Sequence, residues 1–296
     1  MPGRRIRSSS TACCGPSTGP AAARADLFEQ AACVVTPGAK TPAKAILQTE
    51  ELWSAVGGRD HYQNVAVADC GVGSRVANTV LAWDKDKLSA MPTWADFWDV
   101  AKYPGKRGLS KSPRAALEIA LLADGVAVPD VYKTLASKEG QDRAFQKLDQ
   151  LKPYIVWWQT GQEAAHILGS GEVLMTTAQS ARIAMAAKAE NKNFGIQWAG
   201  TIYEVYSWAI AKGSPHVKTA QQYLYFAGFV PVQARLMRQS TMIGWAKGTN
   251  DLLPLEVQAL SPTANLAGAL KQDTAFWHDN DAKLRQRFDA WLSKQN

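Results

Sequence analysis

The sequence predicts an α/β fold that is large enough to divide into two lobes. From about residue 64 onward, short apolar runs typical of buried strands alternate with amphipathic segments typical of helices. Strands that alternate with helices are characteristic of largely parallel sheets. The chain has 296 residues, and a single core tends to split once a chain reaches about 250–300 residues. We therefore expect two lobes, with ligands at the carboxyl ends of strands.

The first patterned elements are two strands followed by two helices. NVAVAD (64–69) and NTVLAWD (78–84) have the β-branched and small apolar residues of buried strands. PTWADFWDV (92–100) predicts a short helix with Thr93 as its N-cap. Pro113 predicts the first turn of the next helix, where its missing N–H is harmless.

The middle of the chain continues this alternation. The segment EGQDRAFQKLDQL places apolar side chains on one helical stripe, as a core-facing helix does. Trp157 and Trp158 are adjacent in an expected strand, so they point to opposite faces of a sheet. We expect helices at 129–137, 139–151, 161–171 and 179–191, and strands at 154–159, 172–178 and 195–199.

The stretch QWAGTIYEVYSWAIAKGSP (197–215) predicts a strand with one unusual face. Alternate side chains of a strand point the same way. One face therefore holds Ile202, Glu204, Tyr206, Trp208 and Ile210. A carboxylate, a phenol and an indole in succession are poor as plain core, because their polar atoms need partners. They suit the wall of a small-molecule pocket. Helices are expected afterwards at about 217–229, 231–239 and 273–293.

Composition excludes several classes of function. The formal charge is +7, but basic residues are scattered among acidic ones, which indicates a solvated surface rather than a nucleic-acid interface. The four histidines lack the spacing of metal ligands. No apolar run approaches the roughly 20 residues that span a bilayer. The spacing of Cys13, Cys14, Cys33 and Cys70 does not decide whether disulfides form.

Motif searches give no catalytic centre. Gly71 and Gly73 follow a strand, but the third glycine of a dinucleotide loop is absent, and another strand follows instead of a helix. Glu118 and Asp124 lie on an expected helix without a second catalytic group to pair with. The sequence therefore predicts a protein that is not an enzyme and needs no cofactor.

Five blocks occur in order along the chain: PTWADFWDVAKYPGKRGL, ALLADGV, QKLDQLKPYIVWW, SGEVLMTTAQSARI and YEVYSWAIAKGSPH. With ADCGVGSRVANTVLAWDKDKL and AFWHDNDAKLRQRFDAWL, they resemble bacterial ABC-transporter solute-binding proteins. The most similar branch is the spermidine/putrescine-binding branch of extracellular solute-binding family 1. The resemblance covers residue 64 to the end.

The resemblance implies a two-lobed periplasmic-binding-protein fold, the Venus-flytrap type II, with a solute in the interlobe cleft. It implies lobe one at 64–84 and 205–296 and lobe two at 85–204, with hinge strands near 78–84 and 203–211. It also implies a periplasmic monomer that delivers solute to ABC-transporter permease subunits, without nucleic acid or membrane insertion.

The N-terminal segment 1–63 does not resemble the strand–helix–strand unit with which this family begins lobe one. We expect this segment to be atypical and poorly ordered, and lobe one to be incomplete. Its start is basic and rich in small residues but lacks the apolar stretch of an intact signal peptide.

The resemblance also implies ligand-binding positions. Polyamine binders hold ammonium groups with carboxylates and aromatic rings. In the stretch SKSPRAALE, around the start of the helix at Pro113, this chain has Ser112 and Ala115 where the family has acids, and Lys111 and Arg114 add positive charge. Glu204 and Tyr206 match an acid–aromatic pair of the family with the two roles exchanged. The further candidates are Thr177, Gln179, Trp208, Asp69, Cys70, Trp198 and Trp245.

Three interpretations remain open. The first is a binding protein for a polyamine such as putrescine or spermidine, or for a related amine. The second is a binding protein for a zwitterionic or anionic solute, which the lost acids and the gained Lys111 and Arg114 favour. The third is a truncated relic that binds nothing.

Overall fold

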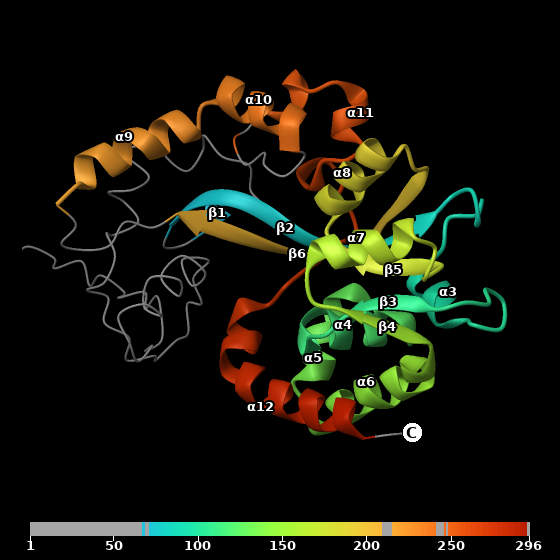
Figure 1. Cartoon of the computed structure of the whole chain (residues 1–296). Coiled ribbons are helices and arrows are strands. Elements are labelled where there is room, and N and C mark those ends of the chain that lie inside the picture. The colour runs from blue at the N-terminus through green and yellow to red at the C-terminus, as the bar shows by residue number, and fades with distance from the viewer. Residues whose placement is uncertain (1–66, 69–70, 209–214, 241–245, 247, 295–296) are drawn as a thin grey trace, which may run out of the picture. The chain divides into compact units, whose positions relative to one another are not determined.

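The computed structural model describes residues 67–68, 71–208, 215–240, 246 and 248–294 (Figure 1). Contacts divide these residues into two compact units. Unit 1 holds the described residues up to Arg75, those from Val205 to Gln233, and residue 246. Unit 2 holds Val76–Glu204 and the described residues from Ala234 and from Gly248 onward. The lobe boundaries expected from the sequence remain a prediction.

Unit 2 is built on a mixed sheet with the strand order β4-β3-β5-β2-β6-β7. The strands are β2 (Gly71–Asp84), β3 (Arg107–Ser110), β4 (Ile155–Trp158), β5 (Met175–Ala178), β6 (Phe194–Trp208) and β7 (Leu270–Lys271). β3 is parallel to β4 and β5, and β6 is parallel to β7. β2 is antiparallel to β5. The expectation of a largely parallel sheet is therefore wrong for β2. A parallel pair needs a crossover helix that directly joins its strands, but β2 begins in unit 1, so no such crossover sets its direction beside β5.

β6 runs as one strand from Phe194 to Trp208, where the sequence predicts two strands, at 195–199 and within 197–215. Gly200 has φ +70, a conformation that favours glycine inside the strand. A Cβ at this position would lie 2.8 Å from Trp94 Nε1. The indole N–H of Trp94 donates to the Gly200 carbonyl at 3.0 Å, so the irregular residue also ties β6 to the helix that follows β2.

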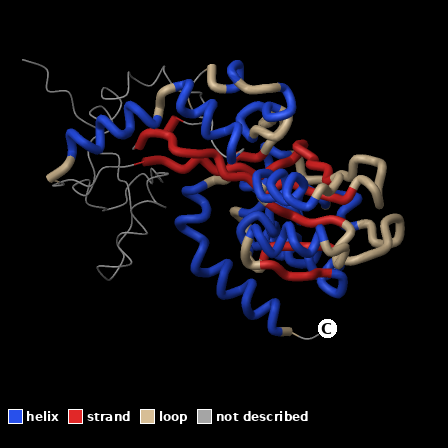
Figure 2. The backbone as a smooth tube through the Cα atoms, turned by 45° about the horizontal axis from the view of Figure 1, so that its top comes forward, coloured by secondary structure: helices blue, strands red, loops and turns tan. Residues whose placement is uncertain are grey.

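One face of this sheet is covered by five helices (Figure 1). They are α3 (Trp94–Trp98), α4 (Pro113–Ala123), α5 (Val131–Leu135), α6 (Lys138–Leu151) and α12 (Thr274–Ser293). The apolar stripe predicted on α6 is confirmed as buried, and α12 packs on the same core with Trp277, Leu284, Phe288 and Trp291. In Figure 2, α12 is the long helix that leads to the C-terminus.

The other face is covered by α7 (Gly161–Gly169) and α8 (Ser180–Glu190). Trp158 packs there with Ala164 and Ile183, whereas Trp157 packs edge-on against Phe288 on the opposite face. The prediction that the two tryptophans point to opposite faces is therefore confirmed.

Local helix signals match the structure closely. Thr93 caps α3, and its side chain and that of Asp96 form a capping box. Ser112 caps α4, and Pro113 occupies its first turn. Short 3-10 turns occur at η4 (Val128–Asp130), η5 (Lys152–Tyr154), η6 (Asn250–Leu252) and η7 (Pro262–Ala264), and α11 spans Leu255–Gln258.

Unit 1 contains the hairpin of β1 (Val67–Ala68) with the start of β2, in which Val67 pairs with Val72. It also contains α9 (Val217–Ala227) and the start of α10 (Val230–Ser240). Buried Gln233 joins the end of α9 to residue 246, because its side chain donates to the Ala227 carbonyl and accepts from the Ala246 N–H. No helix among the described residues is long and apolar enough to cross a membrane.

Candidate functional site

Three turns of unit 2 lie side by side at the carboxyl ends of the parallel strands β3, β4 and β5. The Lys111 N–H, after β3, donates to the Trp158 carbonyl at the end of β4, at 2.8 Å. A Cβ on Gly161 would lie 3.5 Å from the side-chain oxygen of Gln179, which follows β5. We call these turns, residues 110–116, 158–161 and 178–181, the three-turn edge. In α/β sheets this is the edge where ligands bind.

The turn between β3 and α4 has an irregular backbone. The Ser112 hydroxyl accepts from the Arg114 N–H at 3.3 Å. Arg114 is extended, and Ala115 has φ +65 and ψ −38, so the regular helix begins only after them. A non-glycine residue at positive φ costs about 1–2 kcal/mol. Strain of this kind collects at functional sites.

Arg114 is held by the C-terminal helix. Its Nε donates to Asp281 Oδ1 at 2.8 Å, and its guanidinium carbon lies 5.6 Å from the centre of the Trp277 ring. Within the described part of the chain, its two terminal nitrogens have no acceptor. Lys111 is exposed on the same turn, so the turn carries two cationic groups.

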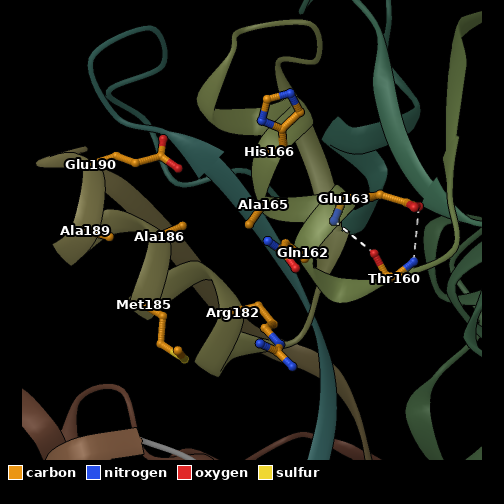
Figure 3. A pocket seen from close by; sticks show the side chains of 10 residues that line it. All are labelled: Thr160, Gln162, Glu163, Ala165, His166, Arg182, Met185, Ala186, Ala189 and Glu190. Atoms are coloured by element: carbon orange, nitrogen blue, oxygen red, sulfur yellow. Dashed lines mark hydrogen bonds between the residues drawn. The ribbon is translucent and has the colours of Figure 1, made fainter.

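The turn between β4 and α7 is closed by its own carboxylate (Figure 3). Glu163 Oε2 accepts from the N–H groups of Gln159 at 2.7 Å and Thr160 at 3.2 Å. In return the Thr160 hydroxyl accepts from the Glu163 N–H at 3.2 Å. These backbone hydrogen bonds, first from Gln159 and then from Thr160, lower the pKa of Glu163. α8 has no acidic residue in its first turn, and the first acidic residue of α4 is the buried Glu118.

The turn between β5 and α8 is fixed by a side chain of β2. Asn78 Nδ2 donates to the Ser180 hydroxyl at 3.0 Å, and the Ser180 N–H donates to Asn78 Oδ1 at 3.1 Å. Sequence reasoning missed both residues. The available signal is a polar residue at a buried position of β2, between Val76 and Val80.

Thr177 and Gln179 occupy different environments beside this turn. Thr177 is buried, and its hydroxyl donates to the Gly108 carbonyl at 3.3 Å, so its side chain links β5 to β3. Gln179 is exposed, and its side chain makes no cap for α8. Of the two, Gln179 presents its side chain to solvent at the three-turn edge.

Two buried side-chain atoms of the described residues have no hydrogen-bond partner: Trp158 Nε1 and Glu118 Oε2. Trp158 ends β4 and is 8% exposed. An unpaired indole N–H in such a position is costly unless a further acceptor reaches it.

The predicted residues of β6 divide between the two units. Glu204 is the last residue of the segment Val76–Glu204 of unit 2, and it is half-buried. In unit 1, the Arg75 guanidinium lies 4.3 Å from the centre of the Tyr206 ring, and Trp208 meets Tyr223 edge-on at 6.0 Å. Trp198 of unit 2 is half-buried.

Four residues predicted from the sequence have no structural description. Asp69, Cys70, Ile210 and Trp245 lie outside the described residues. Their expected roles stay predictions.

A separate hollow of about 580 Å³ lies between α7 and α8 (Figure 3). Figure 3 shows Arg182 and Met185 of α8 opposite Gln162 and Ala165 of α7. Its lining consists of Thr160, Gln162, Glu163, Ala165, His166, Arg182, Met185, Ala186, Ala189 and Glu190. The ligand residues predicted from the sequence do not line it.

Among the described residues, no three His, Cys, Asp or Glu side chains are grouped so that they could hold a metal ion.

Comparison with known proteins gives consistent matches. The sequence profile of the bacterial extracellular solute-binding protein family matches residues 22–251. The γ-aminobutyric acid-binding protein of Pseudomonas aeruginosa is 45% identical over 230 residues, which cover 77% of this chain and 65% of that protein. The chain thus spans about 65% of the length of this relative.

Solved structures agree with these sequence matches. The Atu4243 GABA receptor matches with a TM-score of 0.74 and 26% identity, over 86% of this chain and 78% of that one. The periplasmic binding protein MotA of A. tumefaciens B6, in complex with glucopine, matches with a TM-score of 0.72 and 26% identity, over 84% and 78%. The predicted fold class, α/β of the two-lobed periplasmic-binding-protein type, is confirmed.

Proposed function

Because this chain belongs to the family of bacterial extracellular solute-binding proteins, we propose that it binds a small zwitterionic solute outside the cytoplasm. The solute carries one carboxylate and one ammonium group, as γ-aminobutyrate (GABA) does. The protein delivers it, as a monomer, to the permease of an ABC transporter. Binding without catalysis is supported by the family and by the names of the related proteins.

The observation that carries this proposal is the cationic character of the three-turn edge. Lys111 and Arg114 stand on the β3–α4 turn, and α8 begins at this edge without an acid in its first turn. The first acid of α4 is the buried Glu118, which bonds to Trp277 and Tyr132. A helix N-terminus carries about half a positive charge and favours an anion. A ligand carboxylate suits this edge better than a ligand ammonium does.

Further donors support the same assignment. The Trp158 indole N–H at the end of β4 is unpaired within the described residues, and a carboxylate oxygen would satisfy it. Arg114 is already held at Nε by Asp281, so its terminal nitrogens are oriented before any ligand arrives. Orientation in advance lowers the entropy that binding must overcome.

Glu204 is the proposed partner of the ammonium group, because a carboxylate pairs with a cation. Glu204 stands on β6 two residues before Tyr206, and the family resemblance leads us to expect an acid–aromatic pair at these positions. The Tyr206 ring already lies 4.3 Å from the Arg75 guanidinium, so we assign the ammonium to the carboxylate.

A polyamine is the second candidate ligand, and the Glu204–Tyr206 pair favours it. A polyamine has an ammonium at each end and needs a carboxylate for each. On the β3–α4 turn the family's acids are replaced by Ser112 and Ala115, and Glu163 is engaged in capping α7. The described turns of the edge therefore suit a polyamine less well than a zwitterion.

Calorimetry on the full chain tests this proposal. We expect GABA to bind. We expect Lys111→Glu to lower the GABA affinity about tenfold, because the ligand carboxylate loses an attraction to the lysine and gains a repulsion from the glutamate. The matched control is Lys188→Glu, in the last turn of α8, which should leave GABA affinity unchanged. Equal affinities for the two variants would refute the carboxylate assignment. An absence of heat with every zwitterion and amine, together with non-cooperative unfolding, would favour the relic.

A further inference from the structure

The C-terminal helix α12 reaches the three-turn edge through one ion pair. Arg114 of the irregular turn pairs with Asp281 of α12 at 2.8 Å, across 167 residues of sequence. The same guanidinium lies against the face of Trp277, also on α12. The turn is therefore held by contacts with α12 as well as by the Ser112 cap.

One helical turn further along α4, Glu118 makes a second connection to α12. Glu118 is completely buried. Its Oε1 accepts from Trp277 Nε1 at 2.6 Å and from the Tyr132 hydroxyl at 2.8 Å. Trp277 is thus shared: its N–H is bonded to Glu118, and its ring contacts Arg114. Any change at Glu118 that moves Trp277 also disturbs the support of Arg114.

The second oxygen of Glu118 indicates that the carboxyl carries a proton. Oε2 has no partner among the described residues. A buried ionised carboxylate with an unpaired oxygen is strongly disfavoured, whereas a neutral carboxyl is tolerated. Burial raises the pKa of Glu118 to about 7, although hydrogen bonds from its own backbone, from Trp277 and Tyr132 and from the backbone of Ala115 act in the other direction.

The charged and titratable groups near Glu118 are few. Tyr132 of α5 donates to it, and burial raises the pKa of Tyr132. Arg114 and Asp281 pair with each other on the α12 side. On the α6 side, Arg143 and Lys147 pair with Asp124 at the far end of α4. These charged neighbours pair with one another, so no cation among the described residues pairs with Glu118.

We propose that Glu118 and Asp281 are positioning residues for the β3–α4 turn, and that the proton-bearing carboxyl of Glu118 favours the conformation of the turn that binds the solute. The effect on affinity rests on the proposed function. The effect on the turn itself does not.

Ligand binding then depends on pH. If only the protonated form is competent, the apparent affinity scales with the protonated fraction. With a pKa of about 7, this fraction falls about tenfold between pH 6 and pH 8. GABA keeps the same charges over this range, so the protein causes the change.

The first experiment follows amide hydrogen exchange of residues 110–116 in the ligand-free chain of residues 1–296. Asp281→Asn should accelerate this exchange about fivefold, because a partly buried ion pair contributes up to about 1 kcal/mol. Asp281→Glu should restore the slow exchange.

The control is Asp142→Asn, which breaks another cross-helix ion pair of α12, between Asp142 and Arg287 at 2.6 Å, on the side of α6. This variant should leave the exchange of 110–116 unchanged. If both variants accelerate the exchange equally, α12 stabilises the unit in general and the positioning role is refuted.

The second experiment measures GABA affinity at pH 6, 7 and 8 for the wild type and for Glu118→Gln. We expect the wild type to weaken about tenfold over this range and the variant to stay constant. A variant that keeps the pH dependence would exclude Glu118 as its source. If GABA does not bind at any pH, the proposed function fails while the exchange experiment still decides the positioning role.

Discussion

The N-termini of α7 and α4 lie at the same edge of the sheet but are completed in different ways. α7 begins regularly: the Thr160 hydroxyl accepts from the Glu163 N–H, and the Glu163 carboxylate accepts from the N–H groups of Gln159 and Thr160. α4 begins with an extended Arg114 and a left-handed Ala115, and it relies on Asp281, far along the chain, to hold Arg114. One end is locally complete, and the other keeps positive charge without an acid of its own. The contrast suggests that α7 supports the edge while α4 meets the solute.

The largest expected effect concerns Glu118, which lies behind the α4 end. Its folded-state pKa, about 7, is above its ordinary value of 4.5. The resulting stability is fully present below pH 4.5 and is lost as the pH rises through 7. Relative to Glu118→Gln, the wild type should lose about 2–3 kcal/mol of unfolding free energy between pH 5 and pH 8. Parallel urea titrations of the two proteins measure this, and parallel pH profiles would contradict it.

The next effect tests the completed end. Thr160→Ala removes the N-cap hydroxyl of α7 and should lower the free energy of unfolding by about 1 kcal/mol. Because this end is engaged internally, GABA affinity should not change. Denaturation measures the change in stability, and calorimetry measures the GABA affinity. A loss of affinity without a loss of stability would contradict the proposed difference between the N-termini of α7 and α4.

A substitution at the strained start of α4 should raise the free energy of unfolding instead of lowering it. Ala115→Gly relieves positive φ and should stabilise the protein by about 0.5–1 kcal/mol, after the entropy of glycine is subtracted. The matched control is Ala116→Gly, one position later in the regular helix, which should destabilise by about 1 kcal/mol. The same sign for both variants in thermal unfolding would show that Ala115 is not strained.

The smallest effect concerns Glu163. Its pKa is lowered by backbone hydrogen bonds, so its contribution to stability is present above its unfolded-state pKa and is lost as the pH falls through the folded-state value. Glu163→Gln should therefore destabilise at pH 7 and become neutral near pH 3. Thermal unfolding at the two pH values measures this, and an equal penalty at both would assign the role to packing instead of charge.

These same regions show what local sequence patterns can predict. The Thr93 cap, the stripe of α6 and the opposite orientation of Trp157 and Trp158 depend on neighbours in sequence, and each was predictable. The direction of β2 and the continuity of β6 through Gly200 depend on the tertiary path of the chain. Periodicity carries no information about such a path.

The site was less predictable than the fold for the same reason. Its connections join Asn78 with Ser180, Arg114 with Asp281, and Glu118 with Trp277, over separations of 102, 167 and 159 residues. The resemblance directed attention to Lys111, Ser112 and Gln179, which the structure places at the three-turn edge. It could not show that the Thr177 hydroxyl bonds inside the sheet or that Asp281 of α12 pairs with Arg114.

The most direct test of the central claim compares the binding of three ligands with the same four-carbon chain to the chain of residues 1–296. GABA has one carboxylate and one ammonium, putrescine has two ammonium groups, and butyrate has only the carboxylate. Calorimetry should give the tightest binding for GABA, weaker binding for butyrate and none for putrescine. Tighter binding of putrescine than of GABA would contradict a carboxylate at the three-turn edge and would favour the polyamine.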